Sequence, residues 1–172
     1  MQIKNKLTGE ILWQIDADTL VGARLSEANL TNADLGGVDL SEADLRYADL
    51  TGADLSHAKL RNTDMRGAHV CDADLTHADL SGVIAGSDKP SEAATLCNVE
   101  MNHSNLSFAD FRGVDLHEAQ MKDCLCQDTD FSNANMNRAN LSGSSLLHCM
   151  LTDTYLRSAD LSHTNLSGSH LN

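Results

Sequence analysis

The chain has 172 residues, with 25 acidic against 12 basic side chains and a net charge of −13. This charge argues against direct binding to nucleic acid, because the phosphates would repel it. No stretch contains the roughly 18 consecutive apolar residues of a membrane-spanning helix, so we expect no membrane association. Residues 1–16 lack the apolar core and cleavage site of a secretory signal, and the expected location is the cytoplasm.

The N-terminal segment has a pattern of its own. Two runs that alternate apolar and polar residues flank Thr8 and Gly9, which predicts a β-hairpin. The first unit of a repeat array exposes an apolar end and open strand edges that must be covered. We therefore expect this hairpin to cap the array that follows it, with Ile11, Trp13 and Ile15 facing the array.

From residue 17 onward an apolar residue, called the centre here, recurs at every fifth position. The first run spans residues 17–85 and has 13 centres, beginning with Leu20; the second spans residues 94–172 and has 16, beginning with Leu96. A small side chain (Ala, Val, Ser, Thr or Cys) stands two residues before 28 of these 29 centres. Two coupled columns of this length indicate one continuous repeat domain.

A step of five fits neither a straight helix nor a straight strand. In an α-helix it would turn successive centres by about 140°, and in a strand it would place them on opposite faces. Both conflicts vanish if the chain bends once per repeat: the centre and the small residue point inward, the residue between them points outward, and the other two form a corner. Eight of the 11 glycines stand two residues after a centre, where a turn with positive φ favours glycine: Gly22, Gly37, Gly52, Gly67, Gly82, Gly113, Gly143 and Gly168. The pattern predicts a solenoid of stacked coils.

The repeats LSEANL, GADLSHAKL and RSADLSHTNL resemble the A(D/N)LxX motif of the pentapeptide-repeat family, over residues 18–85 and 94–172. The resemblance implies an all-β fold, a right-handed quadrilateral parallel β-helix with four pentapeptides per coil. It further implies about seven coils, in which side chains 20 residues apart stack at about 4.8 Å. The leucine centres and frequent alanines are most similar to cyanobacterial members of the family.

The inward positions predict the core. Its centres include Leu25, Leu45, Met65, Leu116, Phe111, Phe131, Leu141 and Leu161. Three of the five cysteines, Cys124, Cys126 and Cys149, also fall on inward positions, where cysteine serves as a small apolar residue rather than as a metal ligand. Cys71 and Cys97 stand one residue after centres and face outward, and we expect both to be free thiols.

An interruption at residues 86–93 separates the two runs. Between Leu80 and Leu96 two centres are missing and one extra residue is present. We consider three interpretations: a corner loop that bulges from a continuous helix, a seam between two half-rods, and a recognition loop on a rigid scaffold. The candidate recognition residues are Ser87, Asp88, Lys89 and Pro90, the only proline.

Aspartate occupies the outward position before the centre in 12 repeats. In a coil of 20 residues Asp34, Asp54 and Asp74 form a vertical row, which like charges tolerate only when they are solvated or matched by a partner. These three are the candidate partner-facing acids. His57 and His77 stack 20 residues apart without an orienting acid at a recognisable spacing, and the sequence has no phosphate-binding glycine loop or metal-binding motif. We therefore expect no enzyme activity, no cofactor and no metal.

These observations favour a binding or scaffold module for a protein partner that the sequence does not identify. The resemblance provides an alternative, because quinolone-resistance members of the family imitate B-form DNA and occupy the DNA site of DNA gyrase or topoisomerase IV. Those members are rich in phenylalanine centres, whereas only Phe111 and Phe131 are aromatic centres here, and the acid is spread over the chain. The repeat continues to Leu171, and the resemblance implies a homodimer joined through the C-terminal coils.

Overall fold

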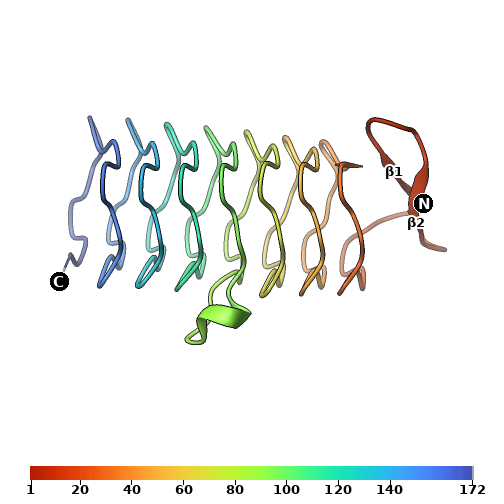
Figure 1. Ribbon diagram of the computed structural model, residues 1–172, viewed down its shortest axis with the longest axis horizontal. Helices are drawn as coiled ribbons and strands as arrows, with labels where there is room; N and C mark the ends of the chain where they lie inside the picture. Colours follow the sequence, from red (N-terminus) through yellow and green to blue (C-terminus); the bar gives the residue numbers. More distant parts are fainter. Residues whose placement is uncertain (172) are drawn as a thin grey trace.

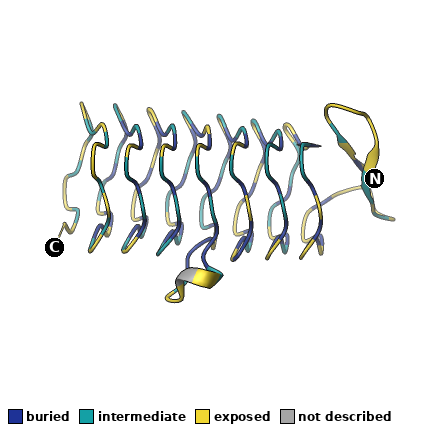
Figure 2. Ribbon diagram, viewed as in Figure 1, coloured by how far each residue is buried: buried dark blue, intermediate teal, exposed yellow. Residues whose placement is uncertain are grey.

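The computed structural model describes residues 1–171 and is an elongated β-helical solenoid (Figure 1). The coils stack along the long axis, with a hairpin at the N-terminal end and the last described coil at the opposite end. One short helical segment, η1 (Pro90–Glu92), projects sideways from the middle of the stack. Buried residues line the inside of the coils, and exposed residues concentrate at the corners, in the hairpin and in the projecting loop (Figure 2).

Main-chain pairing holds neighbouring coils together in parallel. Residues 20 apart form bridges, as Arg24 does with Asp44 and Asp44 with Asp64, so four pentapeptides separate each residue from its partner. From Leu25 to Leu151 the N–H of each centre donates to the next coil, and that of Leu25 meets the Asp44 carbonyl at 2.8 Å. Each wall of a coil is so short that the pairing consists mostly of single bridges, apart from the two-residue strand β3 (Ala33–Asp34).

The corners turn the chain after every centre. The N–H of Ala28 donates to the Leu25 carbonyl at 3.2 Å and closes a turn whose third residue, Glu27, has a φ of 59°. All eight glycines predicted at this position have positive φ, but so do 20 non-glycine residues of the described chain. Glycine is favoured there without being required. Corner N–H groups such as that of Glu27, which donates to the Arg46 carbonyl at 2.8 Å, offset the cost of the left-handed backbone.

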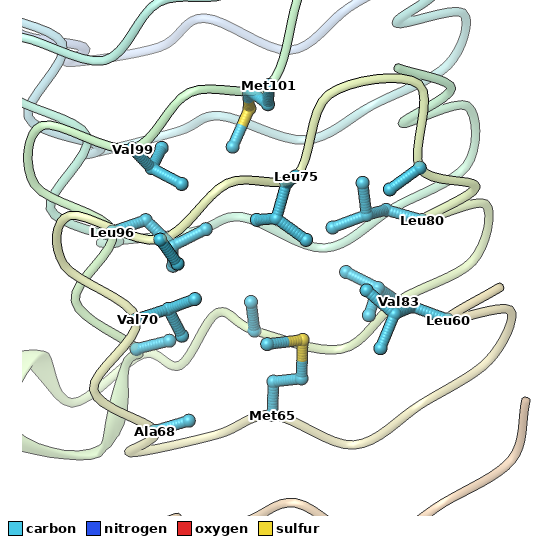
Figure 3. Close-up of a cluster of buried hydrophobic side chains, with 14 of the residues drawn as sticks. Leu60, Met65, Ala68, Val70, Leu75, Leu80, Val83, Leu96, Val99 and Met101 are labelled. Atoms are coloured by element: carbon cyan, nitrogen blue, oxygen red, sulfur yellow. The ribbon is translucent and has the colours of Figure 1, made fainter. Parts of the chain in front are cut away.

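The inward columns form one hydrophobic core along the rod, and Figure 3 shows part of it. Seven of the eight predicted centres are at most 1% exposed: Leu25, Leu45, Met65, Leu116, Phe111, Phe131 and Leu141. The eighth, Leu161, is only partly buried because it lies in the last described coil, which is covered from one side. Phe111 and Phe131 stack on neighbouring coils with ring centroids 5.7 Å apart.

Hydroxyl and thiol groups at the small inward position have hydrogen-bond partners. Four buried polar residues occupy this position: Thr63, Ser104, Thr129 and Ser144. The Thr63 hydroxyl donates to the Leu40 carbonyl at 3.0 Å, and the Cys124 thiol donates to the Met101 carbonyl at 3.0 Å. Serine, threonine and cysteine can replace alanine at this position because they are small and find an acceptor one coil back.

The N-terminal hairpin continues the main-chain pairing at the end of the rod. Strand β1 (Gln2–Asn5) pairs antiparallel with β2 (Ile11–Gln14). On its other side β1 pairs antiparallel with β3, and Lys4 lies opposite Asp34. The hairpin therefore covers a strand edge of the first coil with hydrogen bonds.

The side chains that the hairpin turns toward the core differ from the expected set. Ile3 is 2% exposed and belongs to the core, and Trp13 and Ile15 are partly buried against it. Ile11 is 47% exposed, so the expectation that it faces the array is wrong. The pairing shifts between Ile3 and Lys4, which places Ile11 opposite the exposed Lys4 instead of on the core side.

The interruption is an insertion in one coil. Ala85 is 1% exposed and takes the place of a centre, so one of the two centres that looked absent is an alanine. The Ser87 N–H still bonds to the next coil, and the Ala94 N–H donates to the Ala85 carbonyl at 2.8 Å, which closes the turn found at other corners. Bridges continue across this coil between residues 26 apart instead of 20, so residues 88–93 are the insertion.

The insertion also places two cysteines on neighbouring coils, close enough to form a disulfide. Cys71 and Cys97 form a disulfide with Cα atoms 4.6 Å apart, so the expectation of two free thiols is wrong. Their separation of 26 residues matches the pairing interval only when the six inserted residues are counted. The other three cysteines are free and buried, and burial raises the pKa of Cys124 and of Cys149 to about 12.

Candidate binding site at the loop-bearing corner

The loop leaves the solenoid at a corner that only glycine fits. A Cβ on Gly86 would collide with the backbone N and O atoms of Arg112 and with the Asp110 carboxylate. On the next coil Gly113 provides the surface on which the loop rests, since a Cβ there would lie 3.2 Å from the Ser87 carbonyl oxygen. We use the name loop-bearing corner for residues 85–94 together with Arg112 and Gly113, which form the adjoining corner of the next coil.

Short-range contacts define the shape of the loop. The Lys89 N–H donates to the Ser87 hydroxyl at 3.2 Å, and the Lys89 ammonium donates to the Glu92 carboxylate at 2.9 Å. Pro90 is the first residue of η1. The Asp88 and Lys89 side chains remain 86% and 73% exposed, so both present charge to solvent from a loop whose base is fixed.

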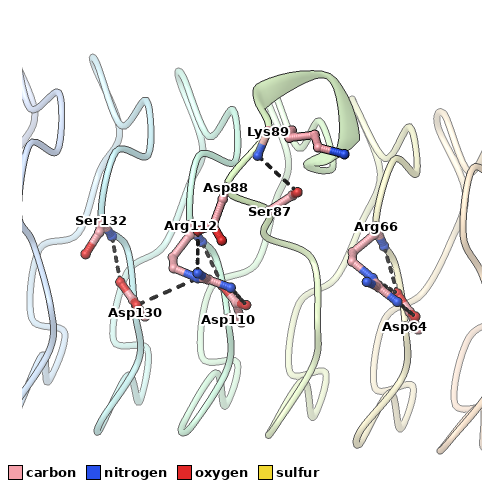
Figure 4. Close-up of polar contacts among 9 residues, drawn as sticks. All are labelled: Asp64, Arg66, Ser87, Asp88, Lys89, Asp110, Arg112, Asp130 and Ser132. Carbon is pink, nitrogen blue, oxygen red and sulfur yellow. Dashed lines mark hydrogen bonds and ion pairs between the residues drawn. The ribbon is translucent and has the colours of Figure 1, made fainter.

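Arg112 connects the loop to the wall of the solenoid (Figure 4). Its guanidinium donates to Asp88 at 2.6 Å and to both carboxylate oxygens of Asp110 at 2.9 and 2.8 Å, with Asp130 at 3.9 Å. The hydrogen bond and charge of Asp110 raise the pKa of Arg112. Burial opposes ionisation of Asp110, but its bonds to Arg112 outweigh burial and lower its pKa. Carboxylates already surround this cation, so the corner is not an anion site.

A hollow lies beside the loop. It has a volume of about 400 Å³ and is lined by Ser87, Asp88, Arg112, Gly113, Asn133 and Tyr155. The Tyr155 side chain is prominent there, because the residue is 61% exposed. An exposed aromatic ring beside hydrogen-bonding groups and a charged pair is typical of a surface that binds another protein.

The three candidate acids form a row on a different wall. Asp34 pairs with Asp54 and Asp54 with Asp74, and the row continues to Glu100. The loop lies at the corner between the wall that contains Ile84 and the next wall, which contains Thr95. The row of acids lies on the wall that follows the Thr95 wall along the chain. The structure therefore brings the acids together with one another but not with the loop.

The outward aspartates also have a structural role that the sequence did not reveal. The Asp54 carboxylate accepts the backbone N–H of Ser56 at 3.0 Å, and Asp74 accepts that of Thr76 at 2.9 Å. Burial opposes the charge on Asp54, but the bonds from Ser56 outweigh it and lower the pKa of Asp54. The repeat favours aspartate and asparagine over glutamate at this position because only a short side chain reaches the N–H two residues on.

Three of the histidines lie one above another on successive coils. His57, His77 and His103 stack in a column with ring centroids 4.8 and 5.0 Å apart. Across residues 1–171, no group of three histidine, cysteine or acidic side chains is arranged to hold a metal ion. The same residues include no helix long and apolar enough to cross a membrane.

The repeat architecture now has an independent match. The family model for pentapeptide repeats fits the chain in eight copies, over residues 23–62, 53–84, 92–125, 124–162 and 134–172. The chain belongs to the pentapeptide-repeat family. The matched segments leave out the hairpin and most of the insertion, the two parts in which this pentapeptide-repeat protein departs from the repeat.

Solved structures of other pentapeptide-repeat proteins are similar to this chain. Rfr23 from the cyanobacterium Cyanothece 51142 is 25% identical over 63% of this chain and 64% of that one, with a TM-score of 0.39. HetL from Nostoc sp. strain PCC 7120, involved in heterocyst differentiation regulation, is 29% identical over 87% and 74%, with a TM-score of 0.30. QnrB1, a plasmid-mediated fluoroquinolone resistance protein, is 19% identical over 92% and 81%, with a TM-score of 0.40.

The aligned part is less than two thirds of the Rfr23 chain. At TM-scores this low, these likenesses do not indicate a shared function. No curated protein sequence matches the chain.

Proposed function

We propose that the protein is a non-enzymatic scaffold that binds a protein partner at the loop-bearing corner. The proposed architecture is a right-handed quadrilateral β-helix of about seven coils, the form that four pentapeptides per turn favour. The observation that carries the proposal is the insertion of residues 88–93, because between residues 17 and 171 it is the one place where the chain leaves the ladder of bridges between coils. A loop with a fixed base on a rigid scaffold is a common way to present recognition residues.

The composition of the corner supports a polar partner surface with basic side chains. Asp88 is 86% exposed, and the net charge of −13 attracts basic partners over a distance. The hollow beside the loop offers Tyr155 and Asn133 for stacking and hydrogen bonding. Binding would then combine long-range attraction to the acidic rod with short-range contacts at the loop.

The loop can be removed without disturbing the repeat. Deleting residues 88–93 joins Ser87 to Ala94 and leaves Gly-Ser-Ala-Thr-Leu, a regular pentapeptide. We expect this loopless variant to keep the circular dichroism spectrum of the full chain. A partner that the full chain captures, and that binds the full chain directly after purification, should not bind the loopless variant. A second variant, Asp88→Ala with Lys89→Ala, keeps the length of the loop and removes the two exposed charges together with their ion pairs to Arg112 and Glu92. A partner that binds both variants as well as the full chain would contradict the proposal.

The DNA-mimic function is the second candidate, and one observation favours it. Asp34, Asp54, Asp74 and Glu100 follow one another along a wall at the coil spacing, and no ion pair reaches them within residues 1–171. The opposite wall is different, since Arg46 pairs with Asp44 and Arg66 with Asp64 there, which reduces its charge. Figure 4 shows the second of these pairs.

Purified protein added to gyrase supercoiling assays, with and without a quinolone, tests this candidate. If it is correct, supercoiling changes, and the Asp34→Asn, Asp54→Asn, Asp74→Asn variant loses the effect. No change with the full chain would remove gyrase from consideration.

Two further parts of the proposal concern assembly and location. The last described coil leaves Leu156 and Leu166 only partly buried and Leu171 57% exposed, which supports a homodimer through the C-terminal coils. A monomeric mass in light scattering at high concentration would exclude it.

The proposed location is the cytoplasm, where the Cys71–Cys97 disulfide is unusual because cytosolic thiols are kept reduced.

A further inference from the structure

The five cysteines fall into two classes with different access to solvent. Cys71 and Cys97 are partly exposed at a corner and form the disulfide. Cys124, Cys126 and Cys149 are at most 1% exposed and lie in the core. A thiolate is needed for exchange, and burial both raises the pKa of these three thiols and keeps reagents away from them. Only the Cys71–Cys97 pair can therefore exchange with a thiol in solution while the protein is folded.

The disulfide lies where the loop-bearing coil begins and ends. Cys71 follows the centre Val70, and Cys97 follows the centre Leu96, the first centre after the chain returns from the insertion. The covalent bond thus encloses the coil of 26 residues and fixes the place at which the chain rejoins the ladder.

This position matters because the repeat itself tolerates several registers. Neighbouring pentapeptides have similar sequences, so a coil that rejoined the stack one pentapeptide early or late would still place apolar residues inside. The regular coils have no loop in which such a slip could be absorbed, whereas this coil has six inserted residues. A bond between Cys71 and Cys97 selects the register in which these two corners are neighbours.

The fold around the disulfide does not depend on it. The Asp72 N–H donates to the Cys97 carbonyl at 3.1 Å, and the Val70 N–H donates to the Thr95 carbonyl at 2.8 Å. These are the same ladder bonds that other coils form without cysteine. Opening the sulfur–sulfur bond therefore leaves a folded coil that is held by its hydrogen bonds and its buried apolar side chains.

We propose that Cys71 and Cys97 are a reversible thiol–disulfide exchange site that fastens the loop-bearing coil when oxidised and releases it when reduced. In reduction, a thiolate of a small or protein dithiol attacks one sulfur, and the other leaves as a thiolate that takes up a proton. A second thiol, from the same dithiol or from a second molecule of a monothiol such as glutathione, then resolves the mixed disulfide. Two electrons and two protons pass to Cys71 and Cys97, and the two thiols of the reductant become a disulfide; oxidation is the reverse exchange with such a disulfide.

Counting thiols in the folded protein tests the proposal. An alkylating reagent should label no cysteine in the oxidised folded protein, two after treatment with dithiothreitol without denaturant, and five after reduction in denaturant. Mass spectrometry should place the two labels on Cys71 and Cys97. In buffers with an increasing ratio of reduced to oxidised glutathione, the labelled fraction of Cys71 and Cys97 should rise. It should fall again when the protein is returned to the oxidised buffer.

The matched control is the Cys71→Ser, Cys97→Ser variant, because serine occupies the same corner position in repeats such as Ser56 and Ser81. Reduction should lower the thermal midpoint of the native chain by roughly 5 °C or more and leave that of the variant unchanged. Two labels before reduction would show that the bond does not form. A disulfide that resists dithiothreitol in the folded protein, or that does not respond to glutathione, would show a permanent crosslink. Either result overturns the proposal.

Discussion

Single residues in this repeat have two functions at once, and only one of them is visible in the sequence. The inward columns follow directly from hydrophobicity, because leucine and alanine at fixed spacing leave one way to bury them. The outward aspartates were predicted as charges on a wall. Their bonds to the N–H two residues on, as from Ser41 to Asp39 at 3.1 Å, show that they also hold the corner. Composition indicates where a charge lies but not which N–H it accepts.

Two glycines at the same repeat position show how a corner and the loop-bearing corner differ. Gly36 and Gly86 each follow a centre directly, but a Cβ on Gly36 would meet only the Asp54 carboxylate at 3.4 Å, an ordinary contact. A Cβ on Gly86 would collide with the Arg112 backbone. We expect Gly86→Ala to lower the free energy of unfolding by about 1–3 kcal/mol and Gly36→Ala to change it by less than about 1 kcal/mol. Urea unfolding measures both, and equal effects would contradict the packing described here.

At the scale of elements, the sequence located the irregular segments better than it described them. Thr8 and Gly9 correctly indicated a turn between two strands. The inward side chains could not be derived by simple alternation, because the pairing shifts between Ile3 and Lys4 and turns Ile11 outward. The insertion was visible as a gap, but its length depended on recognising Ala85 as a centre, and alanine is the weakest apolar signal. The Cys71–Cys97 pairing could not be predicted until that length was known.

The hairpin offers a matched pair of isoleucines. Ile3 is 2% exposed and Ile11 is 47% exposed, although both lie in strands of the same hairpin. We expect Ile3→Ala to lower the free energy of unfolding by about 2–4 kcal/mol, because it leaves a cavity between the hairpin and the first coil. Ile11→Ala should cost less than about 1 kcal/mol. Thermal and urea unfolding of the two variants compare them directly. A larger effect of Ile11→Ala would show that the face of the hairpin that carries Ile11, and not the face that carries Ile3, packs against the core.

For the whole molecule, the sequence was sufficient to predict the stacked architecture because one rule repeats along it. Every coil buries its apolar residues against its neighbours and bonds its main chain to them, so local patterns add up to a rod. For the candidate binding site, the sequence could predict only its position in the chain, at the interruption of the repeat. Its hollow, the ion pair between Arg112 and Asp88 and the exposed ring of Tyr155 come from residues that the repeat brings together from four successive coils.

The most direct test of the stacking interval is an engineered crosslink in the Cys71→Ser, Cys97→Ser background. Ser56 and Thr76 stand 20 residues apart, and the His57 N–H donates to the Thr76 carbonyl at 2.9 Å, just as the Asp72 N–H donates to Cys97. Under mild oxidation, Ser56→Cys with Thr76→Cys should form a disulfide, whereas Ser56→Cys with Ser81→Cys, 25 residues apart on different corners, should keep two free thiols. A crosslink in the second pair but not in the first would contradict coils of four pentapeptides.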